Sequence, residues 1–124
     1  MIWKRLLGFS NEHKNYFMVK EQDRIKNIVT QFYAAIKGIY PVKKIILYGS
    51  HAQSQAAKDS DIDVGVVMDR PDNLQRVDIT ANLFHHARKI DSTIEPKCIF
   101  WDEYQNPEKG SILSEIVRSS IVIV

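Results

Sequence analysis

The chain has 124 residues, of which 44% are hydrophobic and 26% are charged, with 5 glycines and 4 prolines. These values are ordinary for one soluble globular domain, and they exclude intrinsic disorder, collagen-like repeats and low-complexity sequence. A net charge of +2 gives no strong signal for nucleic-acid binding, and the single cysteine, Cys98, excludes an intrachain disulfide. We therefore expect a single domain over residues 1–124.

The N-terminal segment combines apolar and basic residues. Its apolar stretch from Leu6 to Phe9 is too short for a signal peptide, which needs about 7–15 apolar residues in a row. No apolar run approaches the roughly 18–20 residues that span a bilayer. These observations predict a cytoplasmic protein without membrane association.

The first predicted element is an amphipathic helix. Apolar residues recur at three- and four-residue spacing from Glu21 to Tyr40, and Gly38 and Pro41 predict the end of the helix. The stripe consists of Ile25, Ile28, Val29, Phe32, Ile36, Ile39 and Tyr40. The run Lys43–Tyr48 then predicts a buried strand, followed by a tight turn at Gly49-Ser50.

A second strand follows a polar segment. Residues Ala52–Ser60 show no clear period, so we expect a short helix or a loop there. Asp61–Met68 alternates strictly, which predicts a strand with two different faces. One face carries Ile62, Val64, Val66 and Met68, and the other carries Asp61, Asp63, Gly65 and Val67. The cluster Asp69–Asn73 predicts a turn.

The C-terminal half repeats helix and strand. A second helical stripe, ending near Ile90, runs through Leu74, Val77, Ala81, Phe84 and Ala87. Thr93–Trp101 predicts a third strand, in which Pro96 indicates an irregular or edge position. Ser111–Ser119 predicts a last helix through Ile112, Leu113, Ile116 and Val117, and Ile121–Val124 predicts a final strand. The order predicts an α/β (α+β) domain with a small mixed β-sheet flanked by helices.

One constellation of residues points to chemistry. Ten residues separate the Gly49-Ser50 turn from Asp61, and Asp63 follows two positions later. Carboxylates two apart on a strand leave the same face, and such close like charges favour a bound cation. Mg²⁺ takes carboxylate and phosphate oxygens, while a Gly-Ser turn offers N–H groups and a hydroxyl to phosphate. Either feature alone is more often structural, but together they favour metal-assisted phosphoryl or nucleotidyl transfer.

The segment Tyr48–Asp63 resembles the signature of the DNA polymerase β-like nucleotidyltransferase superfamily. Within it, the chain resembles the minimal nucleotidyltransferases, which pair with HEPN-domain toxins in prokaryotic toxin–antitoxin operons. The resemblance covers nearly the whole chain from the first helix onward and implies a polymerase β-like core. It also implies that Gly49 and Ser50 hold the triphosphate of ATP, and that Asp61 and Asp63 bind Mg²⁺ at a two-metal site.

The resemblance further implies a third carboxylate from a neighbouring strand. Glu95 matches that position best, and Asp91, expected at a helix-to-strand turn, is the alternative. Many members carry Gly-Ser-Arg-Ala-Arg, whereas His51 and Gln53 replace both arginines here. These two residues are candidate hydrogen-bond donors to phosphate or base, and the candidate replacement cations are Lys58 and Lys97.

The resemblance implies a Mg²⁺-dependent transfer of AMP from ATP to a hydroxyl, typically of tyrosine, on a partner HEPN toxin. Two alternatives stay open. One is a catalytically weak antitoxin that neutralises the toxin by direct binding, and the other is an aminoglycoside-type small-molecule nucleotidyltransferase. Because we expect no room for an acceptor-binding domain in 124 residues, we expect the acceptor to come from another chain in a hetero-oligomer.

The remaining conspicuous side chains predict structural roles. His85 and His86 are adjacent on a predicted helix, so they point about 100° apart and are expected on or near the surface. We expect Cys98 to be a small buried hydrophobe. We expect Trp101 and Tyr104 to cover the core or to form a partner surface.

Overall fold

The computed structural model describes residues 12–53, 56 and 60–124, and in its first helix the side chains from residue 20 onward. The N-terminal segment around Leu6 and the candidate cation Lys58 lie outside the described residues. Four strands form one mixed sheet in the order β3-β2-β1-β4. Their bounds are Val42–Tyr48 for β1, Ile62–Met68 for β2, Ile94–Phe100 for β3 and Ile121–Val122 for β4. The predicted fold class is confirmed.

The strand pairing explains the position of a proline. Strand β1 is antiparallel to both β2 and β4, whereas β2 and β3 run parallel. Strand β3 therefore lies at an edge of the sheet, where a residue without a backbone N–H is tolerated. The edge position predicted from Pro96 is confirmed.

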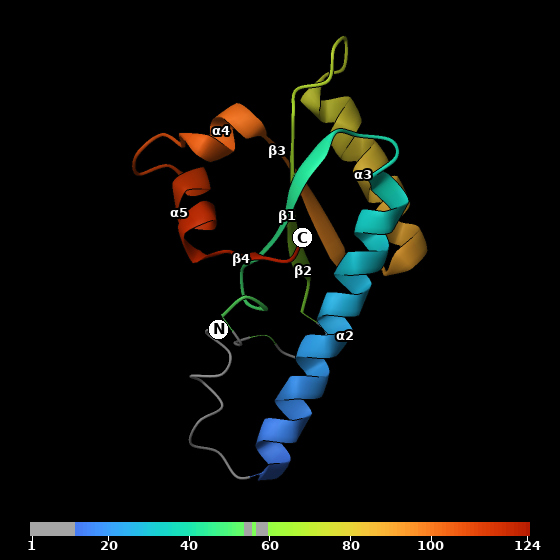
Figure 1. Ribbon diagram of the computed structural model, residues 1–124, viewed down its shortest axis with the longest axis vertical. Helices are drawn as coiled ribbons and strands as arrows, with labels where there is room; N and C mark the ends of the chain where they lie inside the picture. Colours follow the sequence, from blue (N-terminus) through green and yellow to red (C-terminus); the bar gives the residue numbers. More distant parts are fainter. Residues whose placement is uncertain (1–11, 54–55, 57–59) are drawn as a thin grey trace.

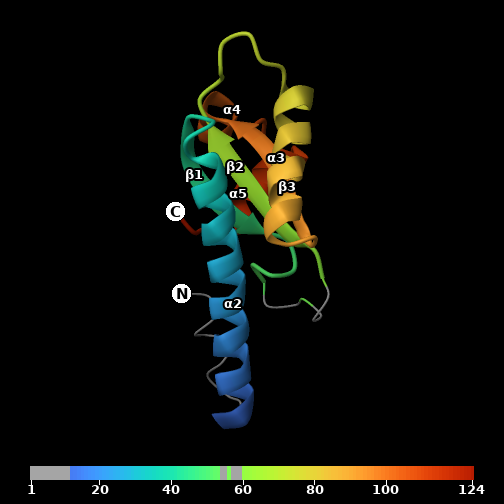
Figure 2. The same cartoon turned by 90° about the vertical axis from the view of Figure 1, so that its right-hand side faces the viewer.

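Helices cover both faces of the sheet. Helices α2 (Glu12–Ile36) and α3 (Arg76–Ile90) lie on one side, and the short helices α4 (Trp101–Gln105) and α5 (Ile112–Ser119) lie on the other, as Figures 1 and 2 show. The main core forms between the sheet and the first helix pair. A smaller cluster of Ile46, Val67 and Ile99 packs under the second pair. The alternating sides of β1, β2 and β3 therefore contribute to two separate apolar layers.

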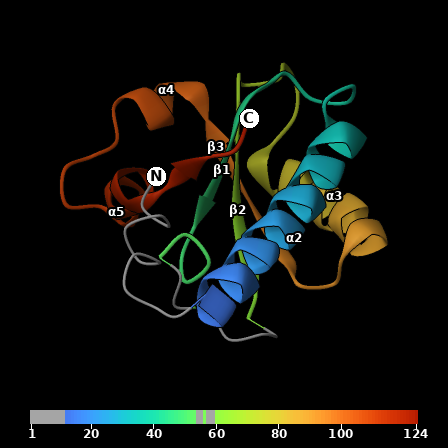
Figure 3. The same cartoon turned by 60° about the horizontal axis from the view of Figure 1, so that its bottom comes forward.

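Helix α2 begins at Glu12, so the predicted start at Glu21 was wrong. The added stretch contains neither glycine nor proline, and nothing in its composition therefore stops the helix. Its predicted stripe is buried apart from half-buried Ile28 and exposed Ile39, which lies in the turn that follows the end of the helix at Ile36. Figure 2 shows α2 extending past the end of the sheet, and Figure 3 shows α2 and α3 next to each other on one side of the strands. Within the described part of the chain, no helix is long and apolar enough to cross a bilayer.

Helix α3 buries a different face from the predicted one. Leu74 and Val77 are 48% and 69% exposed, and Ala81 is exposed as well. The buried residues are instead Ile79, Leu83 and Ala87. Leu74 precedes the helix, which starts at Arg76, and the alternative stripe places larger side chains four residues apart against the sheet. Both stripes share Ala87, so spacing alone did not select the correct face.

Helix α4 was not predicted. Trp101 was expected at the end of a strand but begins this helix, directly after β3. Trp101 and Tyr104 stack with ring centroids 5.7 Å apart and pack on the smaller core cluster, which confirms their predicted role as a cover. Helix α5 starts as predicted, with the Ser111 hydroxyl accepting a hydrogen bond from the Ser114 backbone N–H at 3.1 Å. Its Ile112 is 79% exposed, contrary to the predicted apolar stripe.

Candidate active site

Three side chains line up across the sheet on the face opposite α2 and α3. Tyr48 of β1 pairs with Asp63 of β2, and Asp63 pairs with Glu95 of β3. Because Ile62 and Val64 are buried in the main core, the alternation of β2 turns Asp63 to the other face. We call Tyr48, Asp63 and Glu95 the cross-strand row. The row brings together two of the predicted carboxylates from separate strands.

The predicted phosphate turn lies directly against this row. Gly49 has a φ of 73°, in the left-handed region, and an added Cβ would overlap Oδ2 of Asp63. Glycine is therefore required at position 49 for two reasons, the backbone conformation and the close approach of the carboxylate. The turn continues through a hydrogen bond in which the Gln53 N–H donates to the Ser50 carbonyl at 3.2 Å. Ser50 is half-buried, and the Gln53 side chain is exposed.

Negative charge accumulates in the row. Burial, followed by the charges of Glu95 and Asp61, raises the pKa of Asp63, and nearby His51 opposes that shift. Burial together with the charges of Asp63 and Glu95 raises the pKa of Tyr48 to about 12. Carboxylates that oppose one another's ionisation create an environment that a cation relieves.

The donor chemistry of the row fits a hard divalent cation. Asp63 and Glu95 are direct neighbours across two strands, and exposed Asp61 precedes β2 by one residue. Their oxygens are the ligand type that Mg²⁺ takes. In the described residues, however, no three Asp, Glu, His or Cys side chains form a group that could already hold a metal. The strands supply the donors, and gathering all three around one ion requires changes of side-chain rotamer.

The two candidates for the third carboxylate occupy different environments. Glu95 is exposed and lies opposite Asp63. Asp91 is instead at the C-terminal end of α3, where its Oδ1 accepts hydrogen bonds from the Thr93 N–H and hydroxyl. These bonds lower the pKa of Asp91. The expectation that Asp91 lies at a helix-to-strand turn is confirmed.

Substitutions at these two carboxylates should give opposite results. Glu95→Gln is expected to reduce nucleotide transfer by about 100-fold or more through loss of a charged metal donor, without lowering the unfolding temperature. Asp91→Asn should keep activity but cost about 0.5–1.5 kcal/mol of stability through its weakened turn. Steady-state kinetics and thermal unfolding of both variants check this. The reverse ranking of activities would assign the third donor to Asp91.

The residues that replace the two arginines differ in accessibility. His51 is buried, and its Nε2 lies 3.2 Å from the Ser60 carbonyl oxygen. Gln53, by contrast, projects into solvent beside the turn. Lys97 is exposed on the same face of β3 as Glu95, two positions along. The structure therefore leaves Gln53 and Lys97 accessible and turns His51 inward.

A pocket of about 280 Å³ opens beside Glu95 at the edge of the sheet. It is lined by Tyr48, Arg76, Thr80, Glu95, Pro96, Lys97 and Cys98. Its charged groups are two cations and one carboxylate. Cys98 is buried, as predicted, and burial raises the pKa of its thiol, which keeps it in the unreactive form.

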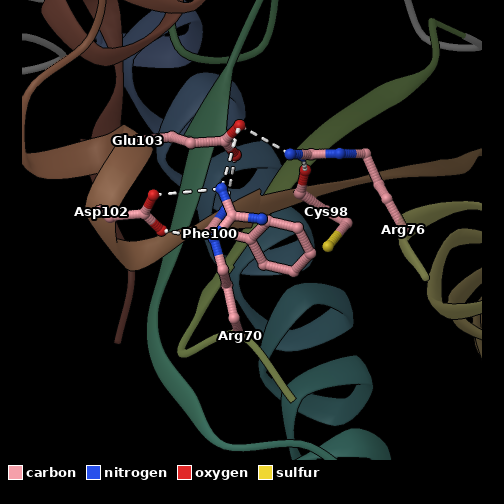
Figure 4. Close-up of polar contacts among 6 residues, drawn as sticks. All are labelled: Arg70, Arg76, Cys98, Phe100, Asp102 and Glu103. Carbon is pink, nitrogen blue, oxygen red and sulfur yellow. Dashed lines mark hydrogen bonds and ion pairs between the residues drawn. The ribbon is translucent and has the colours of Figure 1, made fainter. Parts of the chain in front are cut away.

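Arg76, which lines this pocket, belongs with Arg70 to a cluster of polar contacts around Phe100 (Figure 4). Arg76 donates to the Cys98 carbonyl at 2.7 Å and to Glu103 at 2.6 Å. Arg70 binds Asp102 through two hydrogen bonds of 3.1 and 3.0 Å. Both guanidinium groups lie over the Phe100 ring, 4.3 and 4.4 Å from its centroid. These contacts tie the start of α3 to α4 and fix the position of Arg76.

No sequence pattern pointed to Tyr48, Arg76 or Thr80 as candidate site residues. The position of Tyr48 directly before Gly49-Ser50 could have indicated its place in the site. Side chains alternate between the two faces of a sheet, and Tyr48, as the cross-strand partner of Asp63, lies on the same face. Arg76 and Thr80 reach the pocket only through the packing of α3 on β3, for which the sequence carries no local pattern. His85 is exposed and His86 half-buried, as expected.

Comparison with known proteins assigns the chain to a family. The family model described as a nucleotidyltransferase domain matches residues 23–122. An inferred nucleotidyltransferase of Sulfolobus solfataricus superposes with a TM-score of 0.61 at 15% identity, covering 85% of this chain and 84% of that one. A toxin–antitoxin structure with AMP-PNP superposes with a TM-score of 0.51 at 22% identity, covering 80% and 72%. A search of curated proteins finds no match. Since the family model spans most of the chain and includes the turn and the cross-strand row, the protein belongs to the nucleotidyltransferase domain family and is a nucleotidyltransferase.

Proposed function

We propose that the protein transfers AMP from ATP to a hydroxyl group of a partner HEPN-domain toxin, and acts as its antitoxin. The observation that carries the chemical part is the contact of the Gly49-Ser50 turn with Asp63, beside Glu95 in the next strand. A phosphate-binding turn next to a set of carboxylates is the arrangement that nucleotidyl transfer requires.

Each part of the site has a separate task in this proposal. Gly49, Ser50 and Gln53 bind the triphosphate through backbone N–H groups, a hydroxyl and an amide. Asp61, Asp63 and Glu95 hold Mg²⁺ in a two-metal site. Bound there, the cations would neutralise phosphate charge and acidify the attacking hydroxyl.

The reaction joins the acceptor oxygen to the α-phosphorus of ATP. The bond from that phosphorus to the bridging oxygen of pyrophosphate breaks, pyrophosphate leaves, and the hydroxyl proton passes to solvent. In this step the turn keeps the leaving phosphates in place, and the pocket beside Glu95 orients the incoming hydroxyl.

The pocket favours a protein side chain over an aminoglycoside as acceptor. Its volume of about 280 Å³ suits one side chain better than a complete drug-sized ligand, since pockets for such ligands range over about 300–1,000 Å³. Arg76 and Lys97 also line it, and like charge repels a polycation. The toxin–antitoxin structure with AMP-PNP, which shares the fold, supports the choice of a toxin as partner.

Co-expression with a HEPN-domain toxin tests the proposal. With ATP and Mg²⁺, the toxin should gain about 329 Da for each adenylyl group, as expected for transfer with loss of pyrophosphate. Intact-mass spectrometry measures this gain, and peptide mapping should locate it on tyrosine. The same toxin co-expressed with the Asp63→Asn variant provides the unmodified control.

A catalytically weak antitoxin that acts by binding alone is the second candidate. It is favoured by the absence of arginine at positions 51 and 53 and by the carboxylates, which do not form a metal-binding group in the described residues. It predicts an unchanged toxin mass and protection of cells that survives Asp63→Asn. That pair of results would exclude the catalytic proposal and retain the fold and the partner.

A further inference from the structure

His51 has an environment unlike that of a nucleotide ligand. Its side chain is only 5% exposed, and among the described residues it is the one polar or charged residue in the buried class. Ring atom Nε2 lies 3.2 Å from the carbonyl oxygen of Ser60. Since a carbonyl oxygen only accepts hydrogen bonds, Nε2 carries the proton and donates it. The ring is therefore directed at the backbone nine residues further along the chain.

This hydrogen bond joins the two halves of the site. On one side, His51 belongs to the turn that the Gln53 N–H closes on Ser50, next to Gly49. On the other side, Ser60 directly precedes Asp61. The backbone N–H of Ile62, the first residue of β2, donates a hydrogen bond of 2.8 Å to the carbonyl of Thr93, which directly precedes β3. The imidazole thus ties the phosphate turn to the start of the carboxylate-bearing strand.

We propose that His51 is a positioning residue that sets the distance between the phosphate turn and the carboxylates, and that it does not contact the nucleotide. The inference rests on the proposed function, in which these two parts act together on the triphosphate. A buried donor that satisfies a backbone carbonyl holds one geometry, whereas a phosphate ligand has to reach the open side of the turn. Because a misplacement of reacting groups by about 1 Å costs about 100-fold in rate, the hydrogen bond of His51 affects activity although the side chain does not contact the substrate.

Three substitutions separate positioning from direct binding. His51→Gln places an amide N–H near the original Nε2, His51→Leu keeps bulk but removes the donor, and His51→Arg supplies a phosphate-binding cation too large for the buried site. We expect kcat/KM to fall about 10- to 100-fold in the Leu and Arg variants, as for other residues that orient ligands indirectly, and to stay within about threefold in the Gln variant. His85→Gln and His85→Leu, on an exposed part of α3, are matched controls.

Hydrogen exchange gives a readout that does not depend on catalysis. His51→Leu should speed exchange of the Gln53 and Ile62 amides about two- to tenfold, as expected for losing one hydrogen bond, and His51→Gln should restore the slow exchange. Melting temperatures verify that each variant is folded.

Direct binding predicts the opposite ranking. In that case, the KM for ATP of His51→Arg would equal or fall below that of the wild type. His51→Gln would have a raised KM for ATP and unchanged amide exchange. This combination would overturn the proposal. If the wild-type protein transfers no AMP, the proposed function fails, but the exchange rates still decide the positioning role. Unchanged exchange in His51→Leu would then exclude it.

Discussion

Asp63→Asn is expected to reduce AMP transfer at least about 1,000-fold, because losing one carboxylate from a metal site removes several kcal/mol of charge stabilisation from the transition state. Asp63 occupies the centre of the cross-strand row, between Tyr48 and Glu95 and against Gly49. Asparagine keeps its shape, so the fold remains. Asp61→Asn should act in the same direction. Transfer measured with radiolabelled ATP provides the rate.

The same variant should be more stable than the wild type when metal is removed. The folded protein raises the pKa of Asp63 above its ordinary value of 3.8, so the ionised carboxylate disfavours folding at neutral pH. In EDTA, the unfolding midpoint of Asp63→Asn should exceed that of the wild type at pH 7. The gap should close as pH falls through the raised pKa toward 3.8, since both side chains are then neutral.

Asp69→Asn is the matched control at the other end of β2. Asp69 is exposed and its carboxylate lies 3.7 Å from Lys43, a type of surface pair that contributes little to stability. This variant should retain transfer and show no stabilisation in EDTA. Near-wild-type transfer by Asp63→Asn, with Asp69→Asn equally active, would remove Asp63 from the site.

Gly49→Ala is the second large effect. The new Cβ would overlap Asp63 Oδ2 and lie 3.2 Å from its Cγ, so the carboxylate has to move away from the turn. Displacing this group should lower kcat/KM by about 100-fold or more. The positive φ of 73° should cost a further amount of about 1–2 kcal/mol in folding free energy.

Gly110→Ala separates these two contributions. Gly110 also has a left-handed φ, of 80°, but a Cβ added there meets nothing within 4 Å. We expect Gly110→Ala to lose a similar free energy of unfolding, measured with denaturant, and to retain full activity. The fall in kcat/KM of Gly49→Ala is then attributable to the clash with Asp63. Equal activity of the two variants would show that the turn and the carboxylate work independently.

Features determined by local spacing were predictable. The strict alternation of β2 predicted its core face, and the Gly-Ser turn with its spacing to Asp61 and Asp63 predicted the region in which the turn and the carboxylates lie together. Pro96 likewise indicated an irregular or edge position, because proline has no N–H for the ladder, and its strand does lie at an edge.

Features that depend on distant packing were not predictable. Two overlapping stripes of α3 satisfied helical spacing, and only contact with the sheet selected Ile79 and Leu83 over Val77 and Ala81. Helix α4 is too short for its period to be recognised. The inward turn of His51 depends on a carbonyl nine residues away, so the sequence showed its proximity to the turn but not its partner.

The division of β2 into a core face and a row face limits how this gene can change in length. Deleting one codon inside the strand would exchange the two sets of side chains, burying a carboxylate against α2 and α3 and placing an isoleucine or valine in the row. Folding and catalysis would then be lost in the same step. Codons can be lost or gained within the strand only in pairs, whereas single substitutions at alternate positions affect stability and activity separately.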